Sequence, residues 1–319
     1  MDINILLLLQ EFRKAAGAYL VSFMSKMSFI GEMTTVLILI ALIYWCVSKE
    51  FGKYLLMGWS GNRVVNGLLK VTACVYRPWI RDPRVIPDKE ALELATGYSF
   101  PSGHSMNAAA LYGGGAIRKE LPKVLRIVMG VIAVFIVFSR IFLGVHTPQD
   151  VLVGFGVGLL VMWLTGKLLA WVGKHPEKDI LVMCIGIGIA VAVAIFASLK
   201  SYPVDYDEAG NLLVDGAKMA NDTFKGVGWC IGFLLGWVLE KRFVNFSTDV
   251  PMAARMTRLT LGLLIFYAIN LIFLPCIKEW IPNAGGTTLS CFIQTFYVTF
   301  IFPLCIKYME RNSDRGDAE

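Results

Sequence analysis

Long apolar runs separated by short polar connections dominate this chain. Several approach or reach the roughly 20 residues that cross the hydrocarbon core of a bilayer, among them 127–143, 151–172, 180–199 and 259–274. Together with weaker runs, the pattern predicts about nine membrane helices, which would cover 29–48, 54–74, 104–118, 126–143, 149–172, 179–199, 224–240, 258–276 and 288–306. The pattern therefore predicts an all-α, polytopic membrane protein.

The first 28 residues differ from these runs. Asp2 stands near the start, no basic residue precedes the short apolar stretch Leu6–Leu9, and no small-residue cleavage site follows it. These features are unlike a secretory signal peptide. We expect the segment to be retained as an amphipathic, interfacial helix.

Charge is sparse, at 17% of residues, and its placement predicts an orientation. Basic residues gather in alternate connections, which favours a cytoplasmic location for those loops: Lys49, Lys53, Arg118, Lys119, Lys123, Arg126, Lys174, Lys178, Lys241, Arg242, Arg255, Arg258, Lys307, Arg311 and Arg315. The opposite side holds an acidic loop within 205–222. The N-terminus is then outside and the C-terminus in the cytoplasm. The net charge of +6 forms no basic stripe with interleaved aromatics, so no nucleic-acid partner is indicated.

Small residues and thiols have structural explanations. The seven cysteines show no C-x-x-C spacing, which argues against a zinc site or a disulfide framework. Gly154 and Gly158 lie four residues apart in a long apolar run, a spacing that favours close helix packing. We interpret the triple glycine at 113–115 in the same way.

Two of the three histidines stand at the predicted outer ends of helices. His104 closes the segment Pro101-Ser102-Gly103-His104, and His146 follows Ser139-Arg140 by a few residues. The third, His175, lies in a cytoplasmic loop beside Lys174, and we interpret it as a solvated loop residue.

Cations and backbone donors surround these histidines in the predicted topology. Lys70 and Arg77 are close to two helical turns apart and would share one face if the helix continued to Arg77, with Pro78 ending it. Arg140 reaches the same outer level, and arginine suits bidentate phosphate contacts. Ser102 and Gly103 read as the start of a helix, where free N–H groups attract an anion, although Ser102 is equally explained as an N-cap.

The segment Thr147-Pro148-Gln149-Asp150 has the pattern of a helix start with a capping box. That role alone explains Asp150. A functional interpretation is that Asp150 accepts a hydrogen bond from one nitrogen of His146, which leaves the other nitrogen able to attack phosphorus.

Three blocks follow one another in this chain: Lys70, Arg77 and Pro78; then Pro101-Ser102-Gly103-His104; then Ser139-Arg140 with His146 and Asp150. In this order they resemble the signature of the type-2 phosphatidic acid phosphatase family, whose wider superfamily includes glucose-6-phosphatase and the vanadium haloperoxidases. The resemblance covers roughly residues 49–171. It implies a six-helix phosphatase core with about three additional C-terminal transmembrane helices. We accordingly divide the chain into an N-terminal interfacial helix at 1–28, a phosphatase core at 29–174 and a C-terminal transmembrane extension at 175–319.

The resemblance also implies roles for the site residues. His146 would be the nucleophile that forms a phosphohistidine, Asp150 would orient it, and His104 would protonate the leaving oxygen. The phosphate would be bound by Lys70, Arg77, Ser102, Gly103, Ser139 and Arg140. No metal and no cofactor is expected, so activity should resist EDTA and be inhibited by vanadate.

Members of this family act on lipid phosphates, which makes a phosphorylated lipid the expected substrate: phosphatidate, phosphatidylglycerol phosphate or an isoprenoid diphosphate. An undecaprenyl-diphosphate-like carrier is one candidate if the source is bacterial, with the site on the outer face of the plasma membrane. A sugar-phosphate hydrolase resembling glucose-6-phosphatase is the alternative, since that family also has nine helices and an outside N-terminus. A phosphotransferase, or a non-catalytic transporter or scaffold for phosphate lipids, stays open, as does the oligomeric state.

Overall fold

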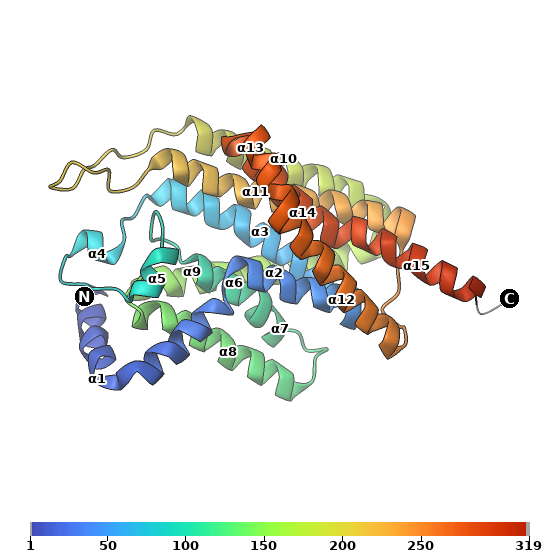
Figure 1. The fold of residues 1–319 in the computed structure, drawn as a ribbon, viewed down its shortest axis with the longest axis horizontal. Coiled ribbons are helices and arrows are strands. Elements are labelled where there is room, and N and C mark those ends of the chain that lie inside the picture. The colour runs from blue at the N-terminus through green and yellow to red at the C-terminus, as the bar shows by residue number, and fades with distance from the viewer. Residues whose placement is uncertain (1, 317–319) are drawn as a thin grey trace. The chain divides into compact units, whose positions relative to one another are not determined.

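The computed structural model describes residues 2–316, and these residues fold almost entirely into helices (Figure 1). The longer helices are α1 (Asp2–Phe29), α3 (Lys49–Ala73), α8 (Lys123–Phe142), α9 (Pro148–Lys174), α10 (Asp179–Leu199), α11 (Gly216–Leu239), α12 (Met252–Ala268), α14 (Asn283–Phe296) and α15 (Phe302–Gly316). The shorter ones are α2 (Met33–Leu42), α4 (Pro78–Arg81), α5 (Lys89–Leu94), α6 (Gly103–Ala108), α7 (Gly114–Ala116) and α13 (Leu274–Trp280). Among the described residues, β-pairing is confined to one isolated bridge, Tyr206–Leu212. The all-α prediction is confirmed.

Five helical stretches are long and apolar enough to cross a membrane: 123–142, 148–174, 176–199, 252–280 and 283–310. A sixth is obtained if α1 and the helix through Val47, which meet at a 60° bend, form one broken span. Each predicted membrane run corresponds to a helix, but α3, the 14-residue stretch from α6 to α7, and α11 are not among these candidates. The chain is an integral membrane protein, and the sequence prediction of about nine spans exceeds this count.

The described helices group into two compact units that alternate along the chain. The first contains residues 1–36, 65–164 and 196–223, and the second contains 37–64, 165–195 and 224–319. The predicted division at residues 28 and 174 stays a prediction, because this grouping follows contacts rather than sequence order. Met1 and residues 317–319, which belong to the predicted end segments, lie outside the described residues.

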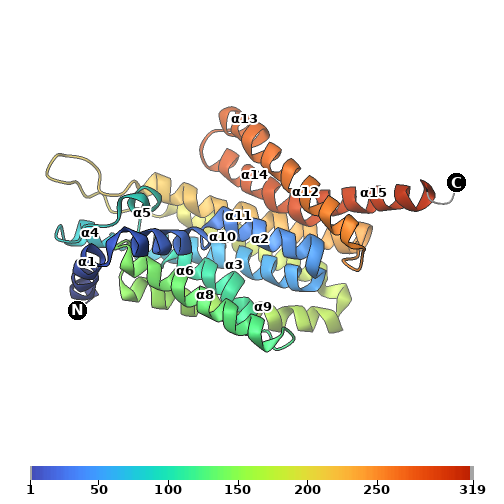
Figure 2. The same cartoon turned by 60° about the horizontal axis from the view of Figure 1, so that its bottom comes forward.

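In the first unit, α1 packs along α8, and α6 packs against both α8 and α9 (Figures 1 and 2). Two glycines of α9 permit the second of these contacts. A Cβ atom on Gly154 would lie 2.9 Å from the carbonyl oxygen of Ser102, and one on Gly158 would lie 2.5 Å from the Cβ of Ala109. The predicted close packing through Gly154 and Gly158 is confirmed. A Cβ on Gly113 would likewise lie 2.6 Å from Leu159.

Replacing Gly154 by alanine should therefore destabilise the first unit. The new methyl group meets backbone, which yields less readily than a flexible side chain, and overpacking of this kind costs about 1–3 kcal/mol. Gly156→Ala is the matched control, because a Cβ at this neighbouring position meets no atom within 4 Å. Thermal unfolding in detergent micelles should show a lower midpoint for Gly154→Ala alone. Equal midpoints for the two variants would contradict the packing.

The second unit has an aromatic and charged core of its own. Trp45 donates its indole N–H to the carbonyl of Val298 at 2.8 Å and packs against Tyr297 and Phe302. The buried carboxylate of Asp179, at the start of α10, receives Lys241 at 3.0 Å and Arg242 at 2.7 Å. These contacts tie the extension helices to α10 and to the π-helical turn at Ile43–Val47, which follows α2, without using any of the predicted site residues.

Candidate active site

Arg77 is a buried cation of the first unit, with 5% of its surface exposed. Its guanidinium donates to three backbone carbonyls, those of Gly97 at 3.0 Å, Thr96 at 3.0 Å and Val145 at 2.9 Å. Burial lowers its pKa to about 10, so it stays protonated at neutral pH. Because these carbonyls are neutral, they fix the guanidinium and leave its positive charge available to an anion.

The same guanidinium determines the proton position on His146. One Nη of Arg77 lies 3.0 Å from Nε2 of His146, and a guanidinium can only donate hydrogen bonds. Nε2 must therefore be the acceptor, which places the proton of the neutral ring on Nδ1. This is the tautomer that leaves Nε2 with a lone pair in contact with a cation.

The opposite ring nitrogen faces a carboxylate. Nδ1 of His146 lies 3.4 Å from Oδ2 of Asp150 and 3.3 Å from the hydroxyl of Ser99. The Ser99 hydroxyl donates to the same Oδ2 at 2.6 Å. A backbone N–H, that of Thr147, adds a third donor at 2.8 Å. A carboxylate oxygen that receives three donors is held in its charged form, which orients and supports the imidazole.

The capping box predicted for the start of α9 is confirmed. The amide of Asp150 donates to the Thr147 hydroxyl at 3.3 Å, while Asp150 receives the Thr147 amide in return. Pro148 is the first helical residue. The structural and functional explanations of Asp150 thus hold together, because its Oδ2 both caps the helix and contacts His146.

Lys70 reaches the site by a different route from the one predicted. Its Nζ donates to the carbonyl of Tyr98 at 2.7 Å and lies 3.4 Å from that of Ser99. The condition for a shared helical face, a helix that continues to Arg77, is not met: α3 ends at Ala73, and Cys74 turns into the left-handed region with φ of 48°. Pro78 begins α4 instead of ending α3. The two cations are brought to one segment, 96–99, by this turn.

The start of α6 lies against the start of α9. The amide of Ser102 donates to the carbonyl of Asp150 at 2.9 Å, and the Ser102 hydroxyl caps α6 by accepting from the Ser105 amide at 3.4 Å. Gly103 and His104 are the first two residues of that helix. Both predicted histidines therefore lie at the same end of the first unit, each beside the N-terminus of a helix.

Arg140 and Ser139 stand in the last turn of α8, both almost fully buried. Arg140 donates to the hydroxyl of Ser28 from α1, while its buried Nε has no hydrogen-bond acceptor among the described residues. Such an unsatisfied, buried donor is uncommon in folded proteins. Ser139 donates to the carbonyl of Ile136 in its own helix at 2.7 Å, so its hydroxyl serves α8 and is not directed to His146 by any contact.

The turn that presents His146 depends on Gly144. This residue adopts φ of 76°, which a side chain rarely tolerates, and it lets the chain reverse directly after α8. Arg13 of α1 braces the turn by donating to the carbonyl of Phe142 at 2.9 Å and to that of Ile86. A helix predicted to lie at the membrane interface thus contributes to the geometry of the site.

Sequence reasoning missed Ser99 and the carbonyls of 96–98. Ser99 lies three residues before Ser102, just outside the segment Pro101–His104 that carries the predicted motif. A hydroxyl this close to a histidine-containing motif is a detectable signal. The carbonyls carry no such signal, since every residue has one.

The protonation of His146 gives a direct test of this environment. Burial, followed by the Arg77 charge, lowers the pKa of the His146 imidazole well below its ordinary 6.5. The ring should therefore stay neutral at pH 6.5 and gain a proton only in more acidic solution. With three histidines in the chain, His104→Gln combined with His175→Gln leaves one imidazole, whose ¹⁵N shifts can be followed by NMR. Half-protonation at or above pH 6.5 would contradict the environment described.

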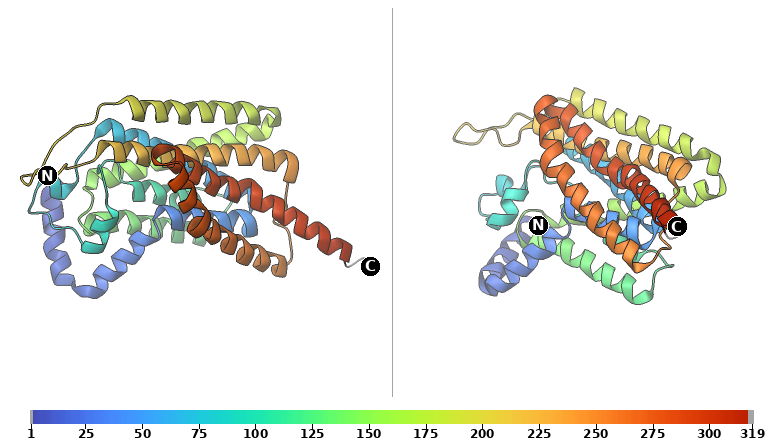
Figure 3. Two further views of the ribbon diagram at one scale, coloured as in Figure 1. Left: turned by 45° about the horizontal axis from the view of Figure 1, so that its top comes forward. Right: turned by 45° about the vertical axis from the view of Figure 1, so that its right-hand side comes forward.

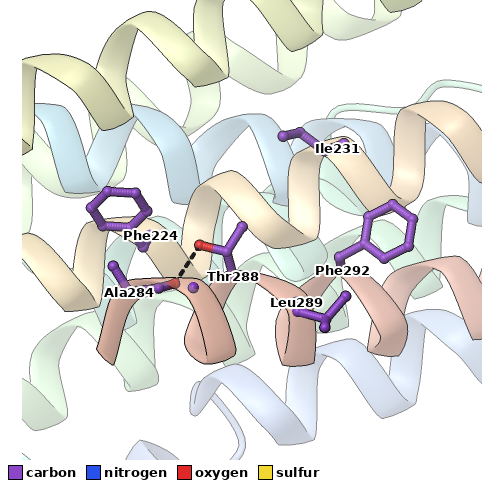
Figure 4. Close-up of a pocket in the computed structure, with 7 residues that line it drawn as sticks. Phe224, Ile231, Ala284, Thr288, Leu289 and Phe292 are labelled. Carbon is purple, nitrogen blue, oxygen red and sulfur yellow. Dashed lines mark hydrogen bonds between the residues drawn. The ribbon is translucent and has the colours of Figure 1, made fainter. Parts of the chain in front are cut away.

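A separate cavity of about 460 Å³ lies in the second unit between α11 and α14 (Figure 4). Its lining is almost entirely apolar, and the one hydroxyl shown, that of Thr288, is occupied by the carbonyl of Ala284 at 2.7 Å. The lining residues are Phe224, Ile231, Ala284, Gly285, Thr288, Leu289 and Phe292. None of them is a predicted site residue. The candidate active site is therefore the polar cluster around Arg77, His146 and Asp150, and not this cavity.

Comparison with known families agrees with the position of that cluster. A family model described as the PAP2 superfamily matches residues 51–174, and one described as the transmembrane extension of PAP2 superfamily phosphatases matches 224–312. The two matches together span more than half of the chain. This chain belongs to the PAP2 superfamily.

Two curated proteins are similar to this PAP2 chain. Phosphatidylglycerophosphatase B of Bacillus subtilis is 42% identical over 121 residues, covering 35% of this chain and 55% of that protein. An undecaprenyl-diphosphatase of Sulfolobus acidocaldarius is 34% identical over 73 residues, covering 23% and 34%. The matched part of the chain thus spans about half, and about a third, of these relatives.

Among solved structures, a transmembrane PAP2-type phosphatidylglycerolphosphate phosphatase from Bacillus subtilis is 31% identical. The match covers 54% of this chain and 85% of that protein, with a TM-score of 0.42. Every predicted site residue, from Lys70 to Asp150, falls inside the matched PAP2 segment 51–174.

Proposed function

We propose that this PAP2 protein is an integral membrane phosphatase that hydrolyses a lipid phosphate or diphosphate through a phosphohistidine intermediate. One observation carries the proposal: Nε2 of His146 holds its lone pair against the Arg77 guanidinium, while Nδ1 faces the Asp150 carboxylate. A binding site for a phosphate lipid needs cations and donors, but it does not need a carboxylate-supported imidazole in a defined tautomer.

In the first step, a substrate phosphoryl group takes the place of His146 as the partner of Arg77. Nε2 attacks phosphorus, the bond to the leaving oxygen breaks, and His104 donates a proton to that oxygen. The imidazole now carries a positive charge, which the Asp150 carboxylate stabilises through the Nδ1 proton. Lys70, Arg77 and Arg140 balance the charge on the nonbridging oxygens, where most of the catalytic effect in phosphoryl transfer arises.

In the second step, water attacks the phosphohistidine and the phosphorus–nitrogen bond breaks. His104, which lost its proton in the first step, accepts one from the water. Inorganic phosphate leaves, and His146 returns with its proton still on Nδ1. Each histidine ends the cycle as it began, so no step requires a metal or a cofactor.

The buried donors support binding of a tetrahedral anion. The unsatisfied Nε of Arg140 would gain an acceptor from a phosphate oxygen. Gly103 and His104 place backbone N–H groups in the first turn of α6, and the Ser102 hydroxyl lies at the N-cap of the same helix. Ser139 is the weakest member of the predicted set, since its hydroxyl is bonded within α8.

The substrate is proposed from the relatives and from the membrane setting. One similar protein is a phosphatidylglycerophosphatase and the other an undecaprenyl-diphosphatase, so both act on a phosphorylated lipid. We favour phosphatidylglycerol phosphate or an isoprenoid diphosphate. The distribution of lysine and arginine supports an outward-facing site, with the N-terminus outside and the C-terminus in the cytoplasm. The similarity to a Bacillus subtilis protein favours a bacterial plasma membrane.

Phosphate release from matched substrates tests this function. Purified protein in detergent should release phosphate from phosphatidylglycerol phosphate or undecaprenyl diphosphate much faster than from glucose 6-phosphate. The activity should survive EDTA and be inhibited by vanadate. Faster release from glucose 6-phosphate would favour the sugar-phosphate alternative, whereas activity that EDTA abolishes and a divalent metal restores would contradict the mechanism.

A further inference from the structure

The segment between the two matched family regions returns to the candidate active site. Residues 196–223 belong to the same compact unit as Lys70, Arg77 and His146. In each view the loop over roughly 200–215 extends at the end of this unit where α4 and α5 lie (Figures 1, 2 and 3). Beyond this loop, α11 begins at Gly216 and carries Met219 on its first turn.

Met219 packs directly behind the backbone that holds the cations. Its thioether sulfur accepts a hydrogen bond from the Tyr98 amide at 3.4 Å, and only 4% of the residue is exposed. A Cβ atom added to Gly97 would lie 2.1 Å from the Met219 methyl carbon. Met219 therefore fills the space left by the missing side chain of Gly97. Around it lie the buried residues Val71, Tyr98, Ala197 and Val214.

The backbone in front of Met219 is the segment that positions the site. The carbonyls of Thr96 and Gly97 accept from Arg77, and those of Tyr98 and Ser99 accept from Lys70. The Ser99 hydroxyl continues to Asp150 and His146. A shift of this short segment would move two cations and the imidazole support together.

Two other contacts hold the returning segment in place. The hydroxyl of Tyr76, the residue before Arg77, donates to the carboxylate of Asp205. A Cβ atom on Gly67, one turn before Lys70 on α3, would lie 2.9 Å from Thr223. The segment thus contacts the chain close to both cations, in addition to its contact at Gly97 and Tyr98.

We propose that Met219 is a positioning residue for the phosphoryl-transfer site, acting through the 96–99 backbone. It touches neither His146 nor Asp150, and it lies outside both regions matched by the family models. The proposal rests on the function proposed above. It gives the segment 196–223 a part in positioning the site.

Volume should matter more than the hydrogen bond in this role. A thioether sulfur is a weak acceptor, whereas removing most of a buried methionine side chain leaves a cavity into which the segment can relax. Met219→Ala should therefore disturb the site, and Met219→Leu, which keeps the volume, should rescue it. Small displacements of positioning groups lower rates by up to about 100-fold.

Three variants, Met219→Ala, Met219→Leu and Met129→Ala, form the test. Met129 is a buried methionine on α8 of the same unit, 8% exposed, so its replacement by alanine removes the same atoms elsewhere. For Met219→Ala we expect kcat/KM to fall about 10-fold or more, mainly through kcat, and the inhibition constant of vanadate to rise in parallel. Met219→Leu should stay within about twofold of the unmodified protein. Equal kinetics in Met219→Ala and Met129→Ala would overturn the proposal.

Amide hydrogen exchange separates this proposal from the proposed function. Peptides covering 96–102 should exchange faster in Met219→Ala than in Met129→Ala, because the Ser99 amide, bonded to the Val75 carbonyl at 2.7 Å, lies in the loosened segment. This measurement needs no substrate. If the unmodified protein released no phosphate from the lipid substrates, the proposed function would be refuted, but the exchange measurement would still test the packing role of Met219. Unchanged exchange at 96–102 in Met219→Ala would refute the packing role itself.

Discussion

Replacing His146 by asparagine should lower kcat on the order of 10⁴-fold or more, the scale seen when a covalent nucleophile is removed. Asparagine keeps a polar group near Nδ1 but supplies no lone pair that attacks phosphorus. Because His146 is buried between Arg77 and Asp150, the loss should appear in kcat and in kcat/KM alike. Steady-state phosphate release from the lipid substrate measures both.

The matched control is His175→Asn. This third histidine is exposed, and its Nδ1 lies 3.0 Å from the carbonyl of Trp171, four residues earlier in the chain. Its replacement should leave kcat within about twofold, the range expected for a surface substitution away from any site. Full turnover by the His146 variant would end the catalytic account and favour a protein that only binds phosphate lipids.

The second large effect is expected for Asp150→Asn, with kcat lowered about 10³-fold to 10⁴-fold, as in other sites where a carboxylate orients a catalytic imidazole. The amide retains an oxygen that can cap α9, so the fold should persist. It removes the negative charge that stabilises the imidazolium during transfer, while Arg77 remains as the donor to Nε2. Kinetics and thermal unfolding should be measured together, since the prediction is a large kinetic loss with a small change in midpoint.

Asp179→Asn is the control for Asp150→Asn. Asp179 is also a buried carboxylate at the start of a helix, but it pairs with Lys241 and Arg242 in the second unit. Its replacement should lower the unfolding midpoint, because both cations lose a charged partner, while kcat changes little. If the two variants lost stability equally and kept equal kcat, Asp150 would be a helix cap and nothing more.

Much of the site was accessible from sequence because its residues lie in local motifs. Ser102 caps α6, and Thr147 and Asp150 form a capping box at α9, as the residue types at those positions predict. Local hydrogen bonding determines these features, so no long-range information is needed. The glycines of α9 were equally readable, since small residues four apart indicate close packing.

The route of Lys70 and Arg77 to the site was not accessible. Helical spacing would place both on one face of a continuous helix, whereas the chain turns at Cys74, and Arg77 occupies the N-cap position of α4. Contacts from distant residues hold this turn: the Ser99 amide, for example, donates a hydrogen bond to the Val75 carbonyl at 2.7 Å. Tertiary contacts of this kind override a local periodicity. The contribution of Met219 was hidden for the same reason, because 121 positions separate it from Tyr98.

Trapping the intermediate tests the central proposal most directly. The protein is mixed with lipid substrate, quenched within milliseconds under alkaline conditions that preserve phosphohistidine, and analysed by peptide mass spectrometry. We predict a phosphoryl group on His146 in the unmodified protein and none on His104 or His175. A phosphorylated residue other than His146, or rapid turnover with no phosphorylated peptide at any quench time, would contradict the mechanism.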